Sequence, residues 1–278
     1  MSRSLFHHQQ SGFSLIELII TIVIGGIVAS MTSSILTLPI NAYIDNSRRA
    51  TLTATADSAL KRMQRDIRRA LPNSIRISAD GKTLELLHIV DGGRYRAKLS
   101  SGATGDILDF SIADTGFDVL GDLQNFSDIT LGTDQLVVYP LNTPGSNAYG
   151  GLGNNITTVS AGSTVDYIVT PAFQFPLKSP QQRFFIIDTP ITYHCDLSAL
   201  AEKDKVLMRY EAYAIQATQP APPSSGGAIQ ANYLSSCTFD YNSGSSTRSG
   251  LVTLEMVLTD EAGESVRLLH QIHVDNQP

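Results

Sequence analysis

Three residues near the start of the chain have types and a spacing that suggest chemistry: Gly12, Phe13 and Glu17, in the stretch SGFSLIEL. Glycine has no side chain, so an extended Gly12–Phe13 bond could enter a narrow protease site at a membrane surface. Cleavage there would release the polar leader MSRSLFHHQQSG and leave Phe13 with a free, positively charged amine. Glu17 lies four residues further on, within reach of that amine on a helix. The residue types and their spacing thus permit cleavage at the Gly12–Phe13 bond and, after cleavage, an ion pair between Glu17 and the new amine.

An apolar run follows Glu17, and no charged residue occurs again until Asp45. Residues 18–38 therefore supply about the 20 residues that a helix needs to cross a bilayer. A carboxylate in lipid costs about 2.5 kcal/mol or more, so Glu17 needs a cationic partner. An ordinary secretory signal is cut after its apolar core, whereas a cut at Gly12 leaves this run on the protein as an anchor.

The same stretch resembles the class III signal of type IV prepilins and type II secretion pseudopilins. In that motif a Gly, usually a Phe, and a Glu five residues after the Gly open an apolar helix, and Gly12, Phe13 and Glu17 match it position by position. The resemblance implies that a prepilin peptidase cuts after Gly12 and methylates the amine of Phe13. It also implies that Glu17 pairs with the N-terminal amine of a neighbouring subunit, which would offset the desolvation of both charges. The alternative is an uncleaved anchor whose Gly12 and Glu17 occur by accident.

A second helical pattern follows Pro39, with apolar residues at three- and four-residue steps that form one stripe of an amphipathic helix. The stripe consists of Ala56, Ala59, Leu60, Met63, Ile67, Ala70 and Leu71. Pro72 disfavours helix at Leu71, so we expect the helix to end there, with bends possible near Pro39 and at the Gly25–Gly26 pair.

The opposite face of this helix is basic, and a solvated surface is the simpler explanation for it. Its charged residues are Lys61, Arg62, Arg65, Arg68 and Arg69. We expect two ion pairs at four-residue spacing, Asp57–Lys61 and Arg62–Asp66.

From Asn73 onward the pattern changes to strands and turns. Residues 74–78, 83–90 and 94–99 predict an antiparallel meander, joined by turns at Asp80–Gly81 and at the DGG of 91–93. Further strands are expected at 135–141, 183–195 and 205–215, and a clear hairpin at 250–260 and 265–274. Residues 100–132 carry too weak a pattern to assign, and 219–227 predict a flexible loop.

A long N-terminal helix followed by an antiparallel sheet again resembles pilins, so we expect an α+β, pilin-like fold. The expected parts are a leader (1–12), a transmembrane half-helix (13–38), an amphipathic half-helix (39–71) and a β-rich periplasmic domain (72–278). The phrases MQRDIRRALPNSIRI, RFFIIDTPITYHCD and LLHQIHVDNQP resemble minor pilins of the MSHA pilus, which belong with the J-type pseudopilins.

The composition is that of a globular protein, with 42% hydrophobic and 17% charged residues. The net charge of −6 gives no support to nucleic-acid binding. Cys195 and Cys237 are the two cysteines, and no zinc-type spacing accompanies them. A disulfide between them is the simplest expectation in the oxidising periplasm, with two buried free thiols as the alternative.

Other groups that could do chemistry favour ordinary structural roles. The stretch YGGLGNN (149–155) lacks a nucleotide-loop motif and predicts a surface loop. His270 and His273 are three apart in a predicted strand, so they should lie on opposite faces, and His194 and Cys195 should point apart. A set of aspartates could gather around calcium but lacks the calcium-loop motif. These are Asp106, Asp109, Asp114, Asp118 and Asp122.

The leading expectation is therefore a protein that is not an enzyme and needs no cofactor: a minor pilin that helps initiate or cap a type IV, MSHA-like pilus. Its expected partners are major and minor pilins, bound through the N-terminal helix, together with the prepilin peptidase and the inner-membrane assembly platform. It should cross the inner membrane once, with the N-terminus cytoplasmic and the body periplasmic or incorporated in the pilus. The alternatives are a type II secretion pseudopilin and, in another class, a membrane-anchored periplasmic enzyme or ligand-binding protein.

Overall fold

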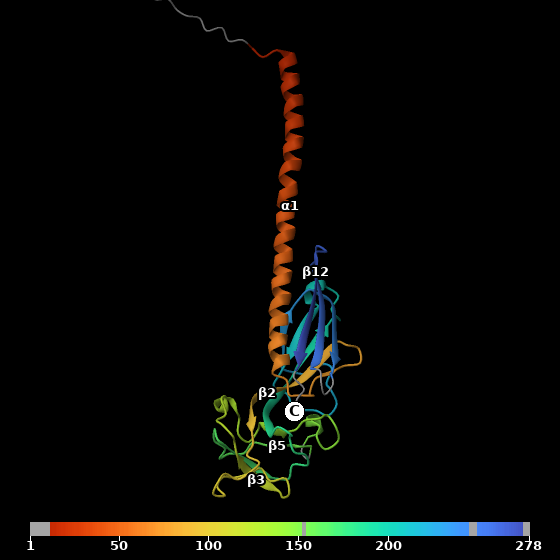
Figure 1. Ribbon diagram of the computed structural model, residues 1–278. Coiled ribbons are helices and arrows are strands. Elements are labelled where there is room, and N and C mark those ends of the chain that lie inside the picture. Colours follow the sequence, from red (N-terminus) through yellow and green to blue (C-terminus); the bar gives the residue numbers. More distant parts are fainter. Residues whose placement is uncertain (1–11, 152–153, 245–248, 275–278) are drawn as a thin grey trace, which may run out of the picture. The chain divides into compact units, whose positions relative to one another are not determined.

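The computed structural model describes residues 12–151, 154–244 and 249–274 (Figure 1). The chain divides into two compact units, one up to Ala50 and the other from Thr51 onward. The helix α1 (Leu15–Arg68) begins in the first unit and ends in the second, and the strands all belong to the second.

The first unit is helical from Leu15, and every side chain described between Gly12 and Ala50 is exposed. Leu15–Thr32 is the one described segment that is long and apolar enough to cross a membrane. The helix continues through Pro39, a possible bend in the sequence, even though proline has no N–H to donate to the preceding turn.

In the second unit the predicted apolar stripe of α1 is buried. Its helical residues Ala56, Ala59, Leu60, Met63 and Ile67 are at most 5% exposed, and so is Leu52, one turn earlier. They share a core with residues of two antiparallel sheets, among them Leu84, Tyr193 and Met256. The expected α+β, pilin-like layout of a long apolar helix followed by antiparallel sheets is confirmed.

The helix ends at Arg68, three residues before the end expected at Leu71. Ala70 instead forms a β-bridge with His88, and the Leu71 N–H donates to the Leu87 carbonyl at 2.8 Å. Backbone groups of Ala70 and Leu71 thus pair with the sheet instead of continuing the helix, which therefore ends before Pro72.

The main sheet has the order β1-β2-β7-β4-β5, with β8 paired to β7 and β9 paired to β8, all antiparallel. Its strands are β1 (Arg76–Ile77), β2 (Thr83–Arg94), β4 (Gln135–Val138), β5 (Ile156–Thr158), β7 (Arg183–Asp196), β8 (Val206–Tyr210) and β9 (Gly227–Ala231). A second sheet contains β10 (Leu234–Asn242), β11 (Gly250–Thr259) and β12 (Ser265–Val274), and a third pairs β3 (Asp114–Asp118) with β6 (Tyr167–Phe173). Short 3-10 helices lie at Phe126–Asp128, Ala148–Gly150 and Glu202–Asp204.

The turn predicted at the DGG of residues 91–93 is wrong, because this segment continues β2 and pairs with β7. A Cβ at Gly92 would lie 3.0 Å from the Phe184 carbonyl oxygen, and one at Gly93 would lie 3.1 Å from the Phe184 ring. The two glycines therefore allow a close approach between strands rather than a reversal of the chain.

The long strands β2 and β7 carry two cores. Leu84 and Tyr193 belong to the core beneath α1, whereas Val90 and Phe184 belong to a second core with the aromatic ring of Phe117. Pro190, which has no N–H, lies between the part of β7 that pairs with β4 and the part that pairs with β8. We refer to residues 91–182, which supply nearly all of the second core, as the acidic lobe.

The hairpin predicted at 250–260 and 265–274 is confirmed by β11 and β12. The turn expected at Asp80–Gly81 is also present, since Gly81 has a φ of 69° and its N–H donates to the Ser78 carbonyl. Strands β3 and β6 were not predicted, because β3 is short with a glycine and two aspartates, and β6 contains a proline, Pro171.

Candidate functional site

The candidate cleavage and assembly site lies at the N-terminal end of α1. Phe13 is 77% exposed and precedes the first helical residue, Leu15. Ser14 caps the helix, because the Glu17 N–H donates to the Ser14 hydroxyl at 3.2 Å. Ser14 and Glu17 thus have the spacing of a capping box. This local role was not predicted, although the S-x-x-E pattern is present in the sequence.

Gly12 is not required by the chain's own packing. A Cβ built at Gly12 would meet no atom within 4 Å, and the same holds for Gly25 and Gly26 in the apolar part of the helix. Any need for glycine at these positions therefore comes from something outside the described chain, such as a protease site or a neighbouring helix.

Glu17 is exposed on the first turn of α1, where a carboxylate interacts favourably with the helix dipole. One turn further on, the Thr21 hydroxyl donates to the Glu17 carbonyl at 2.9 Å, so this hydroxyl has its hydrogen-bond partner within the helix. The Glu17 carboxylate is thus presented to the surroundings of the helix, as an intermolecular partner would require.

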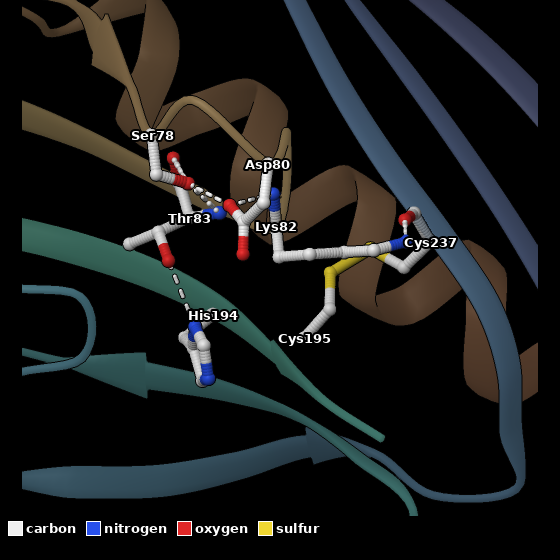
Figure 2. Close-up of a disulfide and its surroundings, with 7 residues drawn as sticks. All are labelled: Ser78, Asp80, Lys82, Thr83, His194, Cys195 and Cys237. Atoms are coloured by element: carbon white, nitrogen blue, oxygen red, sulfur yellow. Dashed lines mark hydrogen bonds between the residues drawn. A yellow bond between two sulfur atoms is a disulfide. The ribbon is translucent and has the colours of Figure 1, made fainter. Parts of the chain in front are cut away.

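Cys195 and Cys237 form a disulfide, the pairing expected from the sequence, with their Cα atoms 6.1 Å apart (Figure 2). Both residues are buried, and they come from different sheets, Cys195 from β7 and Cys237 from β10. The bond therefore joins the two sheets that pack against α1.

Polar contacts surround the disulfide where the β1–β2 turn meets β10. The Lys82 ammonium donates to the Cys237 carbonyl, and the Phe239 N–H donates to the Gly81 carbonyl at 2.9 Å. His194 does not approach the sulfurs as a base would; its Nδ1 lies 2.8 Å from the Thr83 hydroxyl (Figure 2). Burial lowers the pKa of His194, so the ring is neutral near pH 7. The site is a structural cross-link.

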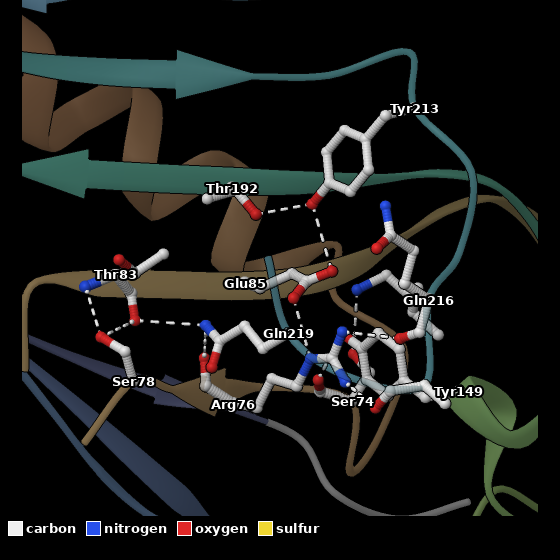
Figure 3. A network of polar contacts seen from close by, with 12 residues as sticks. Ser74, Arg76, Ser78, Thr83, Glu85, Tyr149, Thr192, Tyr213, Gln216 and Gln219 are labelled. Carbon is white, nitrogen blue, oxygen red and sulfur yellow. Dashed lines mark hydrogen bonds and ion pairs between the residues drawn. The ribbon is translucent and has the colours of Figure 1, made fainter. Parts of the chain in front are cut away.

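A buried ion pair is the most polar part of the core. The Arg76 guanidinium lies 2.8 Å from the Glu85 carboxylate, whose side chain is fully buried (Figure 3). Burial raises the pKa of Glu85, and the ion pair with Arg76 opposes this effect. The Tyr213 hydroxyl adds a second donor to Glu85 at 3.1 Å and also lies 2.6 Å from the Thr192 hydroxyl.

The same arginine holds the segment 211–226 against the sheet. Its two terminal nitrogens donate to the carbonyls of Gln216 and Ala217, each at 2.8 Å, while its guanidinium stacks 3.7 Å from the centre of the Tyr149 ring. Among the described residues, no buried side-chain nitrogen or oxygen of this network lacks a hydrogen-bond partner (Figure 3). The network is therefore suited to fixing a loop and not to binding a substrate.

Asp66 differs from its predicted role. It accepts from the Arg209 guanidinium and from the Tyr193 hydroxyl, both at 2.8 Å, instead of pairing with Arg62. The predicted Arg62–Asp66 pair is therefore wrong, because two donors from the sheet bind this carboxylate. The other predicted pair, Asp57–Lys61, is present at 2.6 Å.

The weaker candidates take structural positions. The stretch 149–155 is more buried than the expected surface loop: the Tyr149 hydroxyl donates to the Ser74 carbonyl at 2.8 Å, and Asn155 is fully buried. Residues 152–153 of this stretch lie outside the described residues. His270 and His273 lie on opposite faces of β12, as expected, with His270 partly buried and His273 exposed.

The aspartates considered for calcium serve the loops of the acidic lobe. Asp106 accepts from the Tyr167 hydroxyl at 2.7 Å, Asp118 accepts from Arg96 at 2.9 Å, and Asp114 accepts from the Asp109 N–H at 2.7 Å. Over residues 12–151, 154–244 and 249–274, no cluster of three or more His, Cys, Asp or Glu could hold a metal ion.

Comparison with known proteins identifies the N-terminal signal. Residues 7–33 match the family model of the prokaryotic N-terminal methylation motif. No curated protein sequence and no solved structure matches the chain. The match spans the predicted cleavage bond, Glu17 and most of the apolar run. The chain therefore carries a class III prepilin signal, and its long apolar N-terminal helix followed by antiparallel sheets is similar to the layout of type IV pilins.

Proposed function

We propose that this protein is a minor pilin of a type IV, MSHA-like pilus, which helps to initiate or cap the filament. The observation that carries the proposal is the combination of the N-terminal methylation motif at residues 7–33 with the part of α1 up to Ala50, whose described side chains are all exposed. A helix with such an exposed apolar surface needs lipid or neighbouring helices to cover it.

In this proposal residues 1–12 are removed by a prepilin peptidase, and the new amine of Phe13 is methylated. Residues 13–38 lie in the inner membrane before assembly and in the filament core afterwards, with the remaining body in the periplasm. The disulfide is consistent with that compartment, since such bonds persist in oxidising surroundings. Other pilins and the inner-membrane assembly platform are the proposed partners.

Two features favour a minor pilin over a major pilin: the size of the body and three short stretches of sequence. The body is considerably larger than that of a typical major pilin, so close helical stacking of many copies would be crowded. The phrases at the end of α1, in β7 and in β12 resemble the MSHA pilus biogenesis protein MshO. The J-type pseudopilin of a type II secretion system is the second candidate, and it shares the same signal and helix.

Glu17→Val tests the assembly role. The variant removes a charge from an apolar helix, so insertion and leader removal should proceed normally, while the ion pair with a neighbour's amine is lost. We expect weaker crosslinking to partner pilins in membranes and poor recovery in sheared filaments. Thr21→Val is the matched control, because it replaces a polar residue one turn away whose hydroxyl bonds only within its own helix.

Glu17→Val that crosslinks as efficiently as the parent protein would show that the ion pair does not drive assembly. Recovery of the parent protein with a secretion pseudopilus and not with pili would favour the second candidate.

A further inference from the structure

The exposed face of α1 in the second unit carries four arginines that the body does not neutralise. Arg62, Arg65, Arg68 and Arg69 are all exposed, and we call them the arginine stripe. None of their guanidinium groups forms an ion pair within the part of the chain that the structure describes. Asp66, the carboxylate between them in sequence, is occupied by Arg209 and Tyr193.

Such a stripe is unfavourable for the helix by itself. Arg62 and Arg65 are three residues apart, and Arg65 and Arg69 are four apart, spacings at which like charges destabilise a helix by roughly 0.2–0.5 kcal/mol per pair. The helix dipole favours cations in the last turn, which accounts for Arg68 but not for Arg62, two turns before the end. An anionic surface would remove the repulsion.

The acidic lobe offers a surface of the opposite charge. Residues 91–182 contain nine aspartates against four lysines and arginines, and no glutamate. Two of its segments lie side by side, because the Val119 N–H donates to the Asp166 carbonyl and the Leu123 N–H donates to the Val165 carbonyl, both at 2.8 Å. This brings together a set of exposed residues that we call the acidic edge: Leu120, Asp122, Val165 and Asp166.

The acidic edge matches the chemistry of arginine side chains. The Asp122 and Asp166 carboxylates are exposed and form no ion pair within the described residues, while Leu120 is 43% and Val165 is 42% exposed. Arginine places its aliphatic stem on apolar surface and its guanidinium on carboxylates, and it does so better than lysine.

We infer that the arginine stripe of one copy of this protein docks on the acidic edge of a second copy. The contact uses different surfaces on the two molecules, and each copy carries both surfaces. It goes beyond the proposed function, because it places copies of this protein next to each other and does not depend on the N-terminal amine.

The contact should be weak between free molecules and effective in a membrane. Exposed ion pairs contribute about 0–1 kcal/mol each, and the acidic edge is small compared with a stable interface of about 1,600 Å². Two copies anchored in the same bilayer have a raised effective concentration, so a weak contact between them is occupied more often.

The test uses the full-length protein in phosphatidylcholine vesicles, with a photo-crosslinking amino acid at Ser58. Ser58 is exposed and lies one helical turn before Arg62, and Thr238, exposed on β10, is the control position. We expect dimers crosslinked from Ser58 to a peptide within 118–134 or 160–170, and few from Thr238. Raising the salt from about 0.05 to about 0.5 M should lower the yield, because it shortens the screening length.

Charge reversal decides the assignment. Arg62→Glu/Arg65→Glu/Arg69→Glu should lower the dimer yield about tenfold, as expected for the loss of exposed ion pairs with the two carboxylates of the acidic edge. Asp122→Lys/Asp166→Lys should lower it similarly, and a mixture of the two variants should restore it. Disulfide formation in each variant controls for folding.

Dimers that map to other segments, or a yield unaffected by both reversals, would overturn the inference. Loss of crosslinking from position 58 in phosphatidylglycerol vesicles would also overturn it, because it would show that the arginine stripe binds phosphate headgroups instead.

Discussion

The two halves of α1 differ in what determines their sequences. Between Leu15 and Ala50 no described side chain is buried, whereas from Leu52 onward the apolar residues recur at helical spacing and are almost fully buried. The second half is apolar where its own sheets cover it. Residues 18–38 of the first half are uncharged and mostly apolar, so their sequence is explained by lipid and neighbouring subunits that are not part of the chain.

Glycines show the same contrast. A Cβ added at Gly25 or Gly26 would meet nothing within 4 Å. A Cβ added at Gly92 or Gly93 in β2 would lie against the backbone or the ring of Phe184. A glycine in the body therefore has a reason within the fold, and a glycine in the N-terminal segment needs a reason outside it. Variants at the two kinds of position should therefore respond differently.

The largest effect is expected for Gly12→Arg, which should abolish leader removal because a long side chain would block a narrow protease site. Intact-mass measurement should show the leader still attached and Phe13 unmethylated, with the disulfide formed as usual. Gly26→Ala is the control and should be processed normally. A mature N-terminus at Phe13 in Gly12→Arg would contradict the proposed cleavage.

Within the body, Arg76→Met should be the most destabilising change. It leaves the Glu85 carboxylate buried without its cation and releases the two carbonyls of segment 211–226. Breaking a buried pair on one side costs about 3–5 kcal/mol of unfolding free energy. Urea unfolding in detergent can be followed by near-UV circular dichroism of the tyrosines, since the chain has no tryptophan.

Two variants complete this test. Arg62→Met removes an exposed arginine and should change the unfolding free energy by less than about 0.5 kcal/mol. Arg76→Met/Glu85→Leu removes both charges and should recover much of the loss. A loss in Arg76→Met no larger than in Arg62→Met would show that the buried pair has little importance for folding.

The pH dependence of stability also reports on Glu85. Burial raises its pKa above the ordinary value of 4.5, so between these two pKa values the folded state binds a proton that the unfolded state has released. The contribution of Glu85 to the unfolding free energy therefore falls as the pH rises through this window. Glu85→Gln should flatten that slope, and an unchanged slope would mean that other groups cause it.

Loss of the disulfide should have the next largest effect. Cys195 and Cys237 close a loop with a sequence separation of 42 residues, and the loop-entropy estimate for such a cross-link is about 4 kcal/mol. Cys195→Ser/Cys237→Ser should lower the urea midpoint without changing membrane insertion or leader removal, because the bond lies wholly in the second unit. A variant that fails to be processed would contradict this separation.

The clearest comparison of the two halves of α1 uses one substitution at two places. Ile67 is fully buried and Ile27 is 51% exposed. Ile67→Ala should destabilise the body by about 3 kcal/mol through lost burial and a residual cavity, whereas Ile27→Ala should leave its unfolding unchanged. Equal effects in urea unfolding would mean that the body also depends on the exposed half.

The parts of the molecule that could be predicted from the sequence are those with a local pattern. The motif of Gly12, Phe13 and Glu17 lies within six residues, and the β11–β12 hairpin consists of two strand-like runs joined by a short polar turn, so both are recognisable in the sequence. The prediction of a turn at 91–93 failed because the need for glycine there comes from Phe184, far away in the sequence.

Long-range partners also explain the other errors. The helix spacing rule assigned Asp66 to Arg62, but Arg209 binds it from 143 residues away. The network around Glu85 draws on residues from β1, β7 and the segment 211–226, and none of these has a sequence signal that points to the others. Charge in the core is therefore the feature that sequence reasoning predicts least well here.

The smallest effect is expected for Ser14→Ala, and it should be confined to the first turn of α1. Ser14 accepts from the Glu17 N–H, and loss of such a cap costs about 1 kcal/mol of local helix stability. Before assembly the cap keeps the first turn formed, so that Glu17 is already presented when a neighbouring amine arrives. Amide exchange of residues 15–19 in vesicles should rise in Ser14→Ala and not in Ser14→Asn, which retains a capping oxygen. Exchange in β11 should not change in either variant, because that strand lies in the other unit. If Ser14→Ala exchanges like the parent protein but still assembles poorly, the hydroxyl acts on a neighbouring subunit and not as a helix cap.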